Sequence, residues 1–388
     1  MLKKRLCLGL ALIALCGLLF GCTPPVDPTP TVEHSLGTDL SIYPVFDNLT
    51  EGEKKIYESI CDAMAAHSSE PITIGLYPTE AELKQAEDRL LKLYQQVSYD
   101  HPDCFWVNAH QHNKITTQYP SGYLLELEIS YIIDQTTAQQ LQPKYDAKVQ
   151  EIVASAQQIP DLFDRVLYVY DTIMGITEYD RVLEKSNDTA QLGRTAYGCL
   201  VEGKTVCSGY AMAFASIMEK LGIECGVEFD SYSYNPLATD GHVWNYCKLD
   251  GEYYYFDLTW DDTAFESESY QEYLPYSHLY FAITRDDLSK ATYALDANAP
   301  TPDCTGKKYN YFIYQGLNFE SYDFDSVKAV ITEQEDDVIF LRFDSYYDLE
   351  QAKIDLIDNQ KIFSILPDTE GVRYLMTDTD LHLMIIVE

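Results

Sequence analysis

Apolar and polar positions in the first part of the chain repeat with helical and then with extended spacing. Capping boxes of the form Thr-x-x-Glu begin at Thr50 and at Thr79, and each precedes a stripe of apolar residues at helical spacing, so a helix is predicted after each. Between these helices, residues 72–77 alternate as a strand does. Residues 123–133 alternate Leu and Ile with Glu and Ser, which is typical of a half-buried strand.

A helix and then a hairpin are predicted in the middle of the chain. Gly222 is suited to end the helix, whose apolar stripe begins soon after Cys207, so Cys207 falls at or near the helix N-terminus. Further on, Asp250-Gly251 separates two strand-like stretches and is a dipeptide favoured in two-residue type I′ turns. The residues of the helical stripe are Ala211, Phe214, Ala215 and Met218.

The register of this hairpin places two polar side chains on one face. If Leu249 pairs with Glu252, Asp257 falls opposite Trp244. His242 and Trp244 point to the same face, so Asp257 is the diagonal neighbour of His242 and lies within reach of a hydrogen bond. A carboxylate there would hold the imidazole in one tautomer and leave its other nitrogen to pair with a thiol.

The last part of the chain mixes both kinds of spacing again. Strands are predicted at 309–319, 338–343 and 381–387, and helices at 326–333 and 349–357. A small α/β sandwich used for docking or spacing is expected from this order.

The N-terminus has the pattern of an export signal. Three basic residues within Met1–Arg5 precede an apolar run, Leu6–Phe20, that is too short to span a bilayer comfortably. The run ends in Leu19-Phe20-Gly21-Cys22, which resembles the lipobox of bacterial lipoproteins. The resemblance implies a mature chain that starts at a lipidated Cys22. Four prolines follow within 23–30 and favour an extended tether that holds the globular part off the membrane.

Charge and composition exclude several classes of protein. The chain of 388 residues has a formal net charge of -35, so nucleic acid and anionic lipid headgroups are poor partners, since both require an excess of Lys and Arg. Any contact with a membrane is therefore expected through the lipid anchor only. With 46% hydrophobic and 13% aromatic residues, the chain is expected to fold into at least one full core.

Five segments are predicted along the chain. They are a lipoprotein signal peptide (1–21), a proline-rich tether (22–38), an N-terminal α/β region (39–156), a catalytic domain (157–298) and a C-terminal α/β region (299–388).

The cysteines favour a thiol enzyme over a metal site. Of the 10 cysteines, two lie in the signal and Cys22 carries the lipid, so an odd number remains and at least one mature thiol stays free. None of them are spaced as C-x-x-C, so neither a metal nor any other cofactor is expected, and pairing among the rest stays open. The remaining cysteines are Cys61, Cys104, Cys199, Cys207, Cys225, Cys247 and Cys304.

Cys207 is the candidate nucleophile. At a helix N-terminus, unpaired backbone N–H groups and the positive end of the helix dipole stabilise a thiolate. Taken alone, such a cysteine is more often a small buried side chain, His242 an ordinary strand histidine and Asp257 a solvated acid. Their joint placement favours the base and orienter of a Cys-His-Asp triad.

Three blocks of this sequence resemble bacterial transglutaminase-like domains of the papain-like Cys-His-Asp superfamily. They are Ala196-Tyr-Gly-Cys-Leu-Val-Glu-Gly-Lys-Thr-Val-Cys207-Ser-Gly-Tyr-Ala, Gly241-His242-Val-Trp-Asn and Tyr255-Phe256-Asp257-Leu-Thr-Trp-Asp. The order Cys, His, Asp and the spacings of 35 and 15 residues are similar to those of the family. The resemblance covers about 160–265, and the flanking regions are reminiscent of surface lipoproteins that carry this domain.

The resemblance implies an α+β fold with a papain/transglutaminase-like core, in which a nucleophile helix packs on an antiparallel sheet, flanked by smaller α/β regions. It implies Cys207 as the nucleophile, His242 as base and then acid, and Asp257 as the orienter. A thioester would form on Cys207 from a protein or peptide amide, and water or an amine would then resolve it. The resemblance does not separate a cysteine protease or amidase from a crosslinking enzyme.

The oxyanion donors are only partly predicted. The Cys207 N–H at the helix start is suited to be one donor. Some relatives of this fold use a glutamine shortly before the nucleophile, but residues 200–206 contain none, and Tyr197 and Trp244 are the remaining candidates for oxyanion or substrate contact.

Two functions stay open. The first is a thiol acyl-transfer enzyme, lipid-anchored to the outer face of a bacterial membrane, with cell-wall peptides as a candidate substrate, although the negative charge opposes approach to anionic wall polymers. The alternative is a non-catalytic surface module that binds peptide or glycan through tyrosine-rich strands such as Tyr253-Tyr254-Tyr255 and retains the triad.

Overall fold

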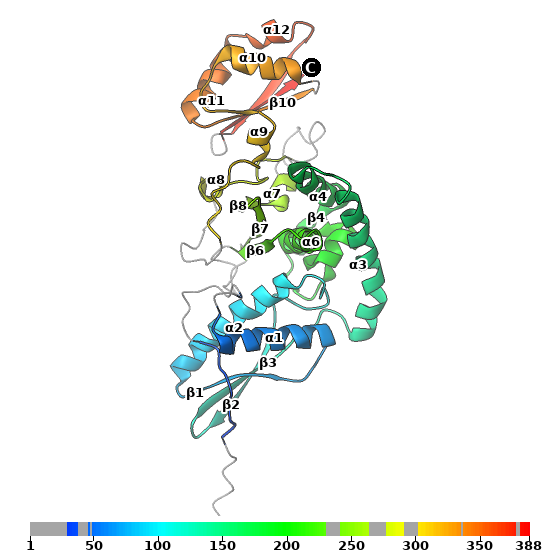
Figure 1. Cartoon of the computed structure of the whole chain (residues 1–388), viewed down its shortest axis with the longest axis vertical. Coiled ribbons are helices and arrows are strands. Elements are labelled where there is room, and N and C mark those ends of the chain that lie inside the picture. The colour runs from blue at the N-terminus through cyan, green and yellow to red at the C-terminus, as the bar shows by residue number, and fades with distance from the viewer. Residues whose placement is uncertain are drawn as a thin grey trace, which may run out of the picture.

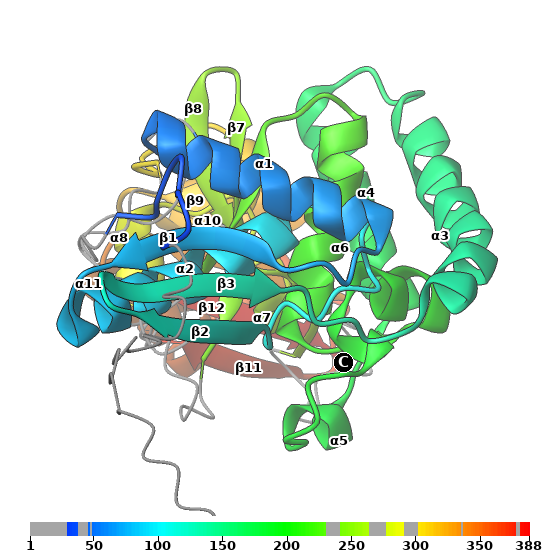
Figure 2. The same ribbon diagram turned by 90° about the horizontal axis from the view of Figure 1, so that it is seen from below.

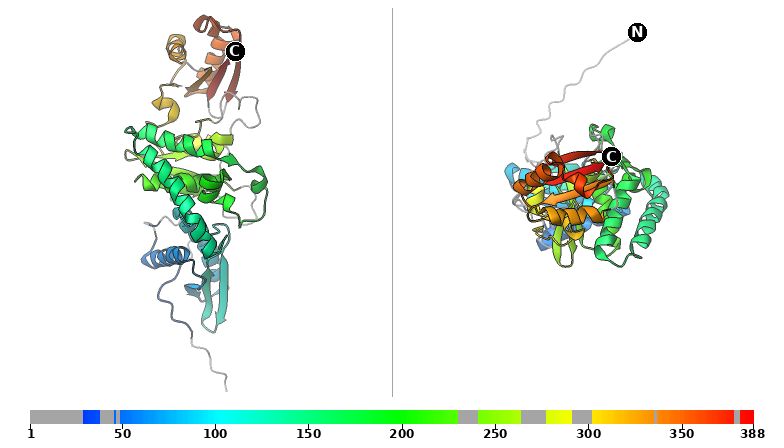
Figure 3. Two further views of the ribbon diagram at one scale, coloured as in Figure 1. Left: turned by 90° about the vertical axis from the view of Figure 1, so that its right-hand side faces the viewer. Right: turned by 90° about the horizontal axis from the view of Figure 1, so that it is seen from above.

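The computed structural model describes residues 29–37, 46, 49–229, 241–263, 277–290, 302–334, 337–377 and 381–388. Three units follow one another along the long axis of the molecule, with the C-terminal unit in orange and red at the top of Figure 1. The side view of Figure 3 shows the same succession. Each unit has its own hydrophobic cluster, and the middle one is the largest. The predicted α+β class is confirmed.

The N-terminal unit packs two helices on a three-stranded antiparallel sheet of order β1-β3-β2. Figure 2 shows β3 between its two neighbours. Both helices begin as the capping boxes predict, and Thr50 N–H donates to Glu53 Oε2 at 2.9 Å. The elements are α1 (Glu51–Ala66), β1 (Ile72–Tyr77), α2 (Glu80–Asp100), β2 (Asn113–Tyr119) and β3 (Gly122–Glu128).

The strand predicted at 123–133 ends earlier, at Glu128. Residues beyond it leave β2 and pair with a different segment, since Asn108 N–H donates to Ser130 O at 2.9 Å and Ile132 N–H to Trp106 O at 2.7 Å. The first part of segment 123–133 therefore pairs within the sheet, as the alternation predicts, but the last part pairs with residues 106–108.

The middle unit surrounds α6 with helices on one side and an antiparallel sheet of order β6-β7-β8 on the other. Its longer elements are α3 (Gln135–Ala156), α4 (Leu162–Ile176), α6 (Cys207–Lys220), β6 (Cys225–Phe229), β7 (Val243–Leu249) and β8 (Glu252–Phe256). Its shorter elements are β4 (Glu178–Tyr179), α5 (Arg181–Glu184), a 3₁₀ turn (Leu192–Arg194), a π-helical turn (Gly198–Glu202), β5 (Lys204–Thr205), α7 (Leu258–Thr263) and α8 (Arg285–Lys290).

The C-terminal unit packs helices on a four-stranded sheet of order β11-β12-β10-β9, in which β9 runs parallel to β10. Its elements are α9 (Tyr311–Tyr314), β9 (Asn318–Phe319), α10 (Phe324–Glu333), β10 (Val338–Phe343), α11 (Tyr346–Lys353), a π-helical turn (Ile354–Asp358), α12 (Ile362–Ile365), β11 (Val372–Thr377) and β12 (His382–Val387).

One prediction in this unit is wrong. Residues 309–319 form a helical turn, α9, and then the two-residue β9, not one strand. The Asn310 side chain caps α9 by accepting from the Ile313 N–H at 3.4 Å. Gly316 then adopts φ 72°, a left-handed conformation that reverses the chain and that few other residues adopt.

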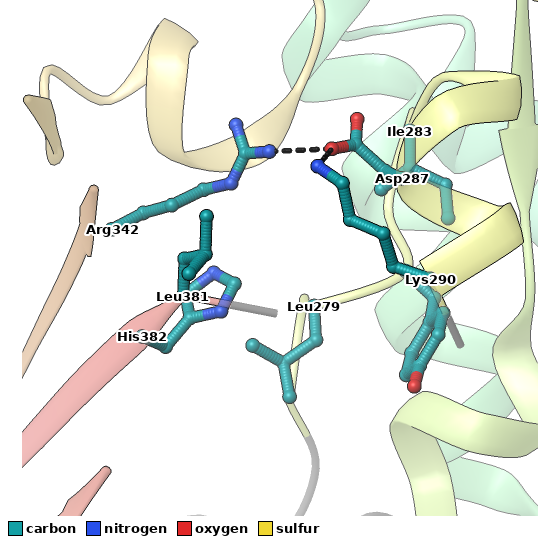
Figure 4. A pocket seen from close by; sticks show the side chains of 8 residues that line it. Leu279, Ile283, Asp287, Lys290, Arg342, Leu381 and His382 are labelled. Carbon is teal, nitrogen blue, oxygen red and sulfur yellow. Dashed lines mark hydrogen bonds and ion pairs between the residues drawn. The ribbon is translucent and has the colours of Figure 1, made fainter. Parts of the chain in front are cut away.

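A small cavity lies where the C-terminal sheet meets α8. Figure 4 shows Arg342 of β10 paired with Asp287 of α8, with His382 of β12 beside them. Arg342 Nη2 and Asp287 Oδ1 are 2.7 Å apart. The cavity has a volume of about 20 Å³, room for a water molecule, and none of the candidate catalytic residues lines it.

The five predicted segments stay a prediction. The signal peptide and Cys22 lie outside the described residues, as does most of the tether. Buried residues of α3, including Tyr145 and Ile152, join the core of the middle unit, although the sequence placed them in the N-terminal region. Across the described ranges, no helix is both long and apolar enough to cross a membrane.

Candidate active site

Helix α6 begins at Cys207, as predicted. The preceding residue, Val206, is extended at φ -119°, and its carbonyl accepts the Gly209 N–H at 2.9 Å. At the other end Gly222 has φ 75°, and Ile223 N–H donates to Met218 O at 2.9 Å, which is the Schellman arrangement. The Cys207 side chain is partly exposed at the start of a helix that is otherwise mostly buried.

Gly209 allows the first turn of α6 to lie against the segment before it. A Cβ at this position would be 1.8 Å from Thr205 Oγ1 and 2.8 Å from Thr195 O. Thr205 in turn donates to Gly193 O at 2.5 Å. The start of α6 is therefore fixed by close backbone packing.

The hairpin of β7 and β8 has the predicted register. Leu249 pairs with Glu252, and the pairing continues to Asn245 and Phe256. Asp250 and Gly251 have φ 50° and 91°, the two positive values that a type I′ turn requires.

His242 and Asp257 meet at the open end of this hairpin. His242 Nε2 and Asp257 Oδ2 are 2.7 Å apart, and the Asp257 side chain is only 2% exposed. The other carboxylate oxygen accepts the Trp260 N–H at 3.1 Å, and the Asp257 backbone N–H donates to Tyr280 O at 3.2 Å. Asp257 is thus held on two sides and fixes the orientation of the imidazole.

The electrostatics of His242 link the three candidate residues. Burial lowers the pKa of His242, but the charge of Asp257 and its hydrogen bond raise it, and a hydrogen bond with Cys207 raises it further, to about 10. Since Nε2 faces Asp257, Nδ1 is the nitrogen left for the thiol. The arrangement therefore favours the imidazolium form of His242 at neutral pH.

Two tryptophans surround the imidazole. The Trp244 ring lies nearly parallel to it, at 6.0 Å between centroids and 23° between planes. Trp260 meets it edge-on at 6.2 Å and is 36% exposed, so part of its indole faces solvent. The sequence predicted Trp244 on the histidine face, whereas Trp260 was missed, although it follows Asp257 by three residues.

Tyr197 is a core residue in this structure. It is 3% exposed, and its ring lies 4.8 Å from that of Phe105. Its role in the oxyanion site stays a prediction. Two other tyrosines, Tyr99 and Tyr179, feel the charge of Cys207: burial raises the pKa of each, and that charge raises it further. No sequence signal connected either tyrosine with Cys207.

A second buried carboxyl group, that of Asp261, lies within α7. Asp261 accepts from Tyr170 Oη of α4 and from Ser277 Oγ, both at 2.5 Å, and from the Tyr280 N–H. Burial raises the pKa of Asp261 well above its usual value. Next to it, Asp262 accepts from Tyr210 of α6. These contacts tie the segment that carries Asp257 to the helix that carries Cys207.

A metal site is not apparent in the described part of the chain. There, no group of three or more His, Cys, Asp or Glu side chains is arranged to hold a metal ion.

Part of the chain is similar to proteins of known structure, and part of it matches a family model. The chain is similar to a solved TGase, at 13% identity and a TM-score of 0.26, over 38% of this chain and 44% of that one. It is also similar to a candidate cysteine protease from Cytophaga hutchinsonii, at 17% identity and a TM-score of 0.24, over 38% of this chain and 62% of that one. No curated protein matches. The family model of the transglutaminase-like superfamily matches residues 147–258, which contain all three candidate catalytic residues, and so supports a transglutaminase-like domain there.

Proposed function

We propose that the protein is a thiol acyl-transfer enzyme that acts on protein or peptide amides through a thioester on Cys207. His242 is its base and then its acid, and Asp257 orients His242. One observation carries the proposal: His242 is hydrogen-bonded to the buried Asp257 at 2.7 Å, and it lies near enough to Cys207, at the start of α6, for the thiol to raise the pKa of the imidazole.

The reaction follows from these positions. The Cys207 thiolate attacks the carbonyl carbon of the amide, and the carbonyl oxygen takes the negative charge of the tetrahedral intermediate. The Cys207 N–H, at the start of α6, is suited to donate to that oxygen. The His242 imidazolium gives its proton to the departing amine or ammonia, and the thioester remains.

The second half of the reaction, in which the thioester is broken, decides the product. His242, now neutral, accepts a proton from water or from an amine as either attacks the thioester. Water releases a carboxylic acid, which makes the enzyme a protease or amidase. An amine forms a new amide, which makes it a crosslinking transglutaminase. Both outcomes use the same three side chains.

The place of action that fits the sequence is the outer face of a bacterial membrane. The basic and apolar N-terminus, Cys22 and the prolines after it support export, lipidation and a tether. Peptides of the cell wall and of other surface proteins are the substrates within reach of such an anchor. Replacement of Cys22 by Ser is expected to release the protein from the membrane fraction.

Alkylation with iodoacetamide tests the proposal directly. Wild type, Cys207→Ala and His242→Ala are labelled between pH 5 and 9 and followed by intact mass. We expect fast modification of one thiol, absent in Cys207→Ala and shifted to higher pH in His242→Ala. Cys225→Ala is the matched control, since Cys225 is another partly exposed thiol. Labelling of Cys207 no faster than a model thiol would overturn the proposal.

Activity on a glutamine peptide then separates the two reactions. Release of ammonia without added amine indicates hydrolysis, and incorporation of a labelled primary amine indicates crosslinking. The competing function, a surface module that binds peptide or glycan, predicts that binding survives in Cys207→Ala and that wild type shows no turnover.

A further inference from the structure

Two cysteines of the middle sheet face each other across neighbouring strands. Cys225, the first residue of β6, is the register partner of Cys247 in β7. Partners in an antiparallel pair project to the same face of the sheet, so both sulfurs lie on one side. Both are free thiols in this structure.

The backbone hydrogen bonds next to Cys225 and Cys247 show whether the two residues form a hydrogen-bonded or a non-hydrogen-bonded antiparallel pair. Lys248 N–H donates to Glu224 O at 2.8 Å, so residues 224 and 248 are a hydrogen-bonded pair. Pair types alternate along antiparallel strands, and the next pair inward, Cys225 and Cys247, is therefore non-hydrogen-bonded. In such pairs the Cα atoms approach to about 4.5 Å and the side chains are closest, which lies within the range of about 4.4–6.8 Å that disulfides require.

Cys225 lies near enough to Cys247 to affect the ionisation of the buried thiol. Burial raises the pKa of the Cys247 thiol well above its usual value, and a hydrogen bond with Cys225 raises it further. Cys247 is fully buried, whereas Cys225 is partly exposed at the edge of the sheet. An oxidant can therefore reach the Cys225 sulfur from solvent, whereas the Cys247 sulfur is shielded from it.

We propose that Cys225 and Cys247 form a cross-strand disulfide when the protein meets a low-molecular-weight disulfide. Cys225, as the thiolate, attacks one sulfur of that disulfide and displaces a small thiolate, which takes up a proton. Cys247 then loses its proton and attacks the Cys225 sulfur of the mixed disulfide, releasing the second small thiol. The two protein thiols lose two electrons and two protons, and the small disulfide is reduced to two thiols.

The bond would form a covalent loop from Cys225 to Cys247, and His242 lies within that loop in the sequence. It would join the strand that follows the nucleophile helix to the strand that follows the base, at the end of the pair farthest from Phe229 and Val243. Cys207 takes no part in it and stays a free thiol. The inference rests on strand register and not on the proposed function, and it suits the oxidising surroundings of an exported protein.

Intact mass of the full chain tests the proposal. The Cys207→Ala background is treated with glutathione disulfide at pH 7.5 and 8.5, since Cys207 itself would exchange with the reagent. We expect a loss of about 2 Da, a Cys225 that no longer alkylates and one peptide pair joining Cys225 to Cys247. Formation is faster at pH 8.5 because Cys247 must ionise. The oxidised protein should unfold at a temperature roughly 5–10 °C higher, since the bond closes a loop in the unfolded chain.

Matched variants separate this bond from other thiol chemistry. Cys225→Ser should abolish the loss of mass, and it avoids any change in the fully buried Cys247. Cys61→Ser should leave it intact, since Cys61 lies in another unit. A stable gain of about 305 Da at Cys225, which is a mixed disulfide that Cys247 never resolves, would overturn the proposal. So would a peptide joining Cys247 to Cys304, whose charge also acts on Cys247.

Discussion

Two contacts between a cysteine and a histidine are found among the described residues, and one of them has the surroundings of a nucleophile. In the middle unit, Cys207 and His242 meet beside Asp257. In the N-terminal unit, Cys61 Sγ lies 3.0 Å from His101 Nε2, with Asp100 nearby. The residue types are the same, so the comparison isolates what their placement contributes.

The position on the helix differs between the two cysteines. Cys207 is the first residue of α6, where unpaired N–H groups and the helix dipole favour negative charge. Cys61 lies within α1, between Glu51 and Ala66, where the backbone N–H groups are used within the helix. A thiolate gains support only at the first of these positions.

The position of the carboxylate differs as well. Asp257 accepts from the imidazole of His242, so its charge stabilises the imidazolium. Asp100 accepts instead from Tyr57 Oη and Gln96 Nε2, each at 2.7 Å. Burial raises the pKa of Cys61, and the charge of Asp100 raises it further, to about 12. A carboxylate that acts on the thiol suppresses the nucleophile, whereas one that holds the imidazole favours it.

The largest expected effect is loss of turnover on removal of one thiol but not of the other. Cys207→Ala should lower kcat by about 10⁵-fold or more, because no other group replaces the nucleophile. Cys61→Ala should keep wild-type kcat. Amide turnover on a glutamine peptide measures both. Equal losses in the two variants would mean that fold stability, not chemistry, is being measured, and thermal unfolding of both variants separates these causes.

Removal of the imidazoles is expected to have the next largest effect. His242→Ala should lower kcat by about 10⁴-fold and move alkylation of Cys207 to higher pH, because the thiolate loses its imidazolium. With the pKa of His242 at about 10, the imidazolium of wild type persists through neutral pH and is lost as pH rises through that value. His101→Ala should leave the pH profile of Cys207 alkylation unchanged. A shift in the His101 variant would contradict the separation of the two sites.

Replacement of each carboxylate by an amide is expected to lower kcat at one of the two sites and not at the other. Asp257→Asn should lower kcat by about 10³-fold with little change in KM, because the amide does not stabilise the imidazolium that forms in the reaction. Asp100→Asn should leave both constants unchanged. The split between kcat and KM is the measurement, since misfolding would lower the amount of active enzyme in either variant. A large rise in KM for Asp257→Asn would instead indicate that Asp257 shapes the substrate site.

The sequence predicted the parts of the site that depend on local rules. The capping boxes, the start of α6 and the hairpin register all rest on neighbouring residues, and the register alone brought Asp257 to His242. The environment of the thiol comes from distant segments, and no local pattern indicates it. Tyr99 of α2, Tyr179 of β4 and the Asp261 contacts belong to this class.

The same distinction explains the errors in the fold. Residues 309–319 have a strand-like composition, yet a cap from Asn310 and a left-handed Gly316 favour a helical turn. The strand predicted to reach residue 133 ends at Glu128 because the segment around Val107, far away in the sequence, competes for its hydrogen bonds. Hydrophobic periodicity does not identify the partner of a strand.

The smallest expected effect is a pH-dependent change in the free energy of unfolding that depends on Asp100. Burial raises the pKa of Asp100 above 3.8 in the folded protein, so the folded state holds this proton more tightly than the unfolded chain does. As pH rises from about 4 through the folded value, wild type should therefore lose stability relative to Asp100→Asn, by about 1–2 kcal/mol. Urea unfolding of both proteins at pH 4, 5.5 and 7 measures this difference. A difference that stays constant with pH would contradict a raised pKa of Asp100 in the folded protein.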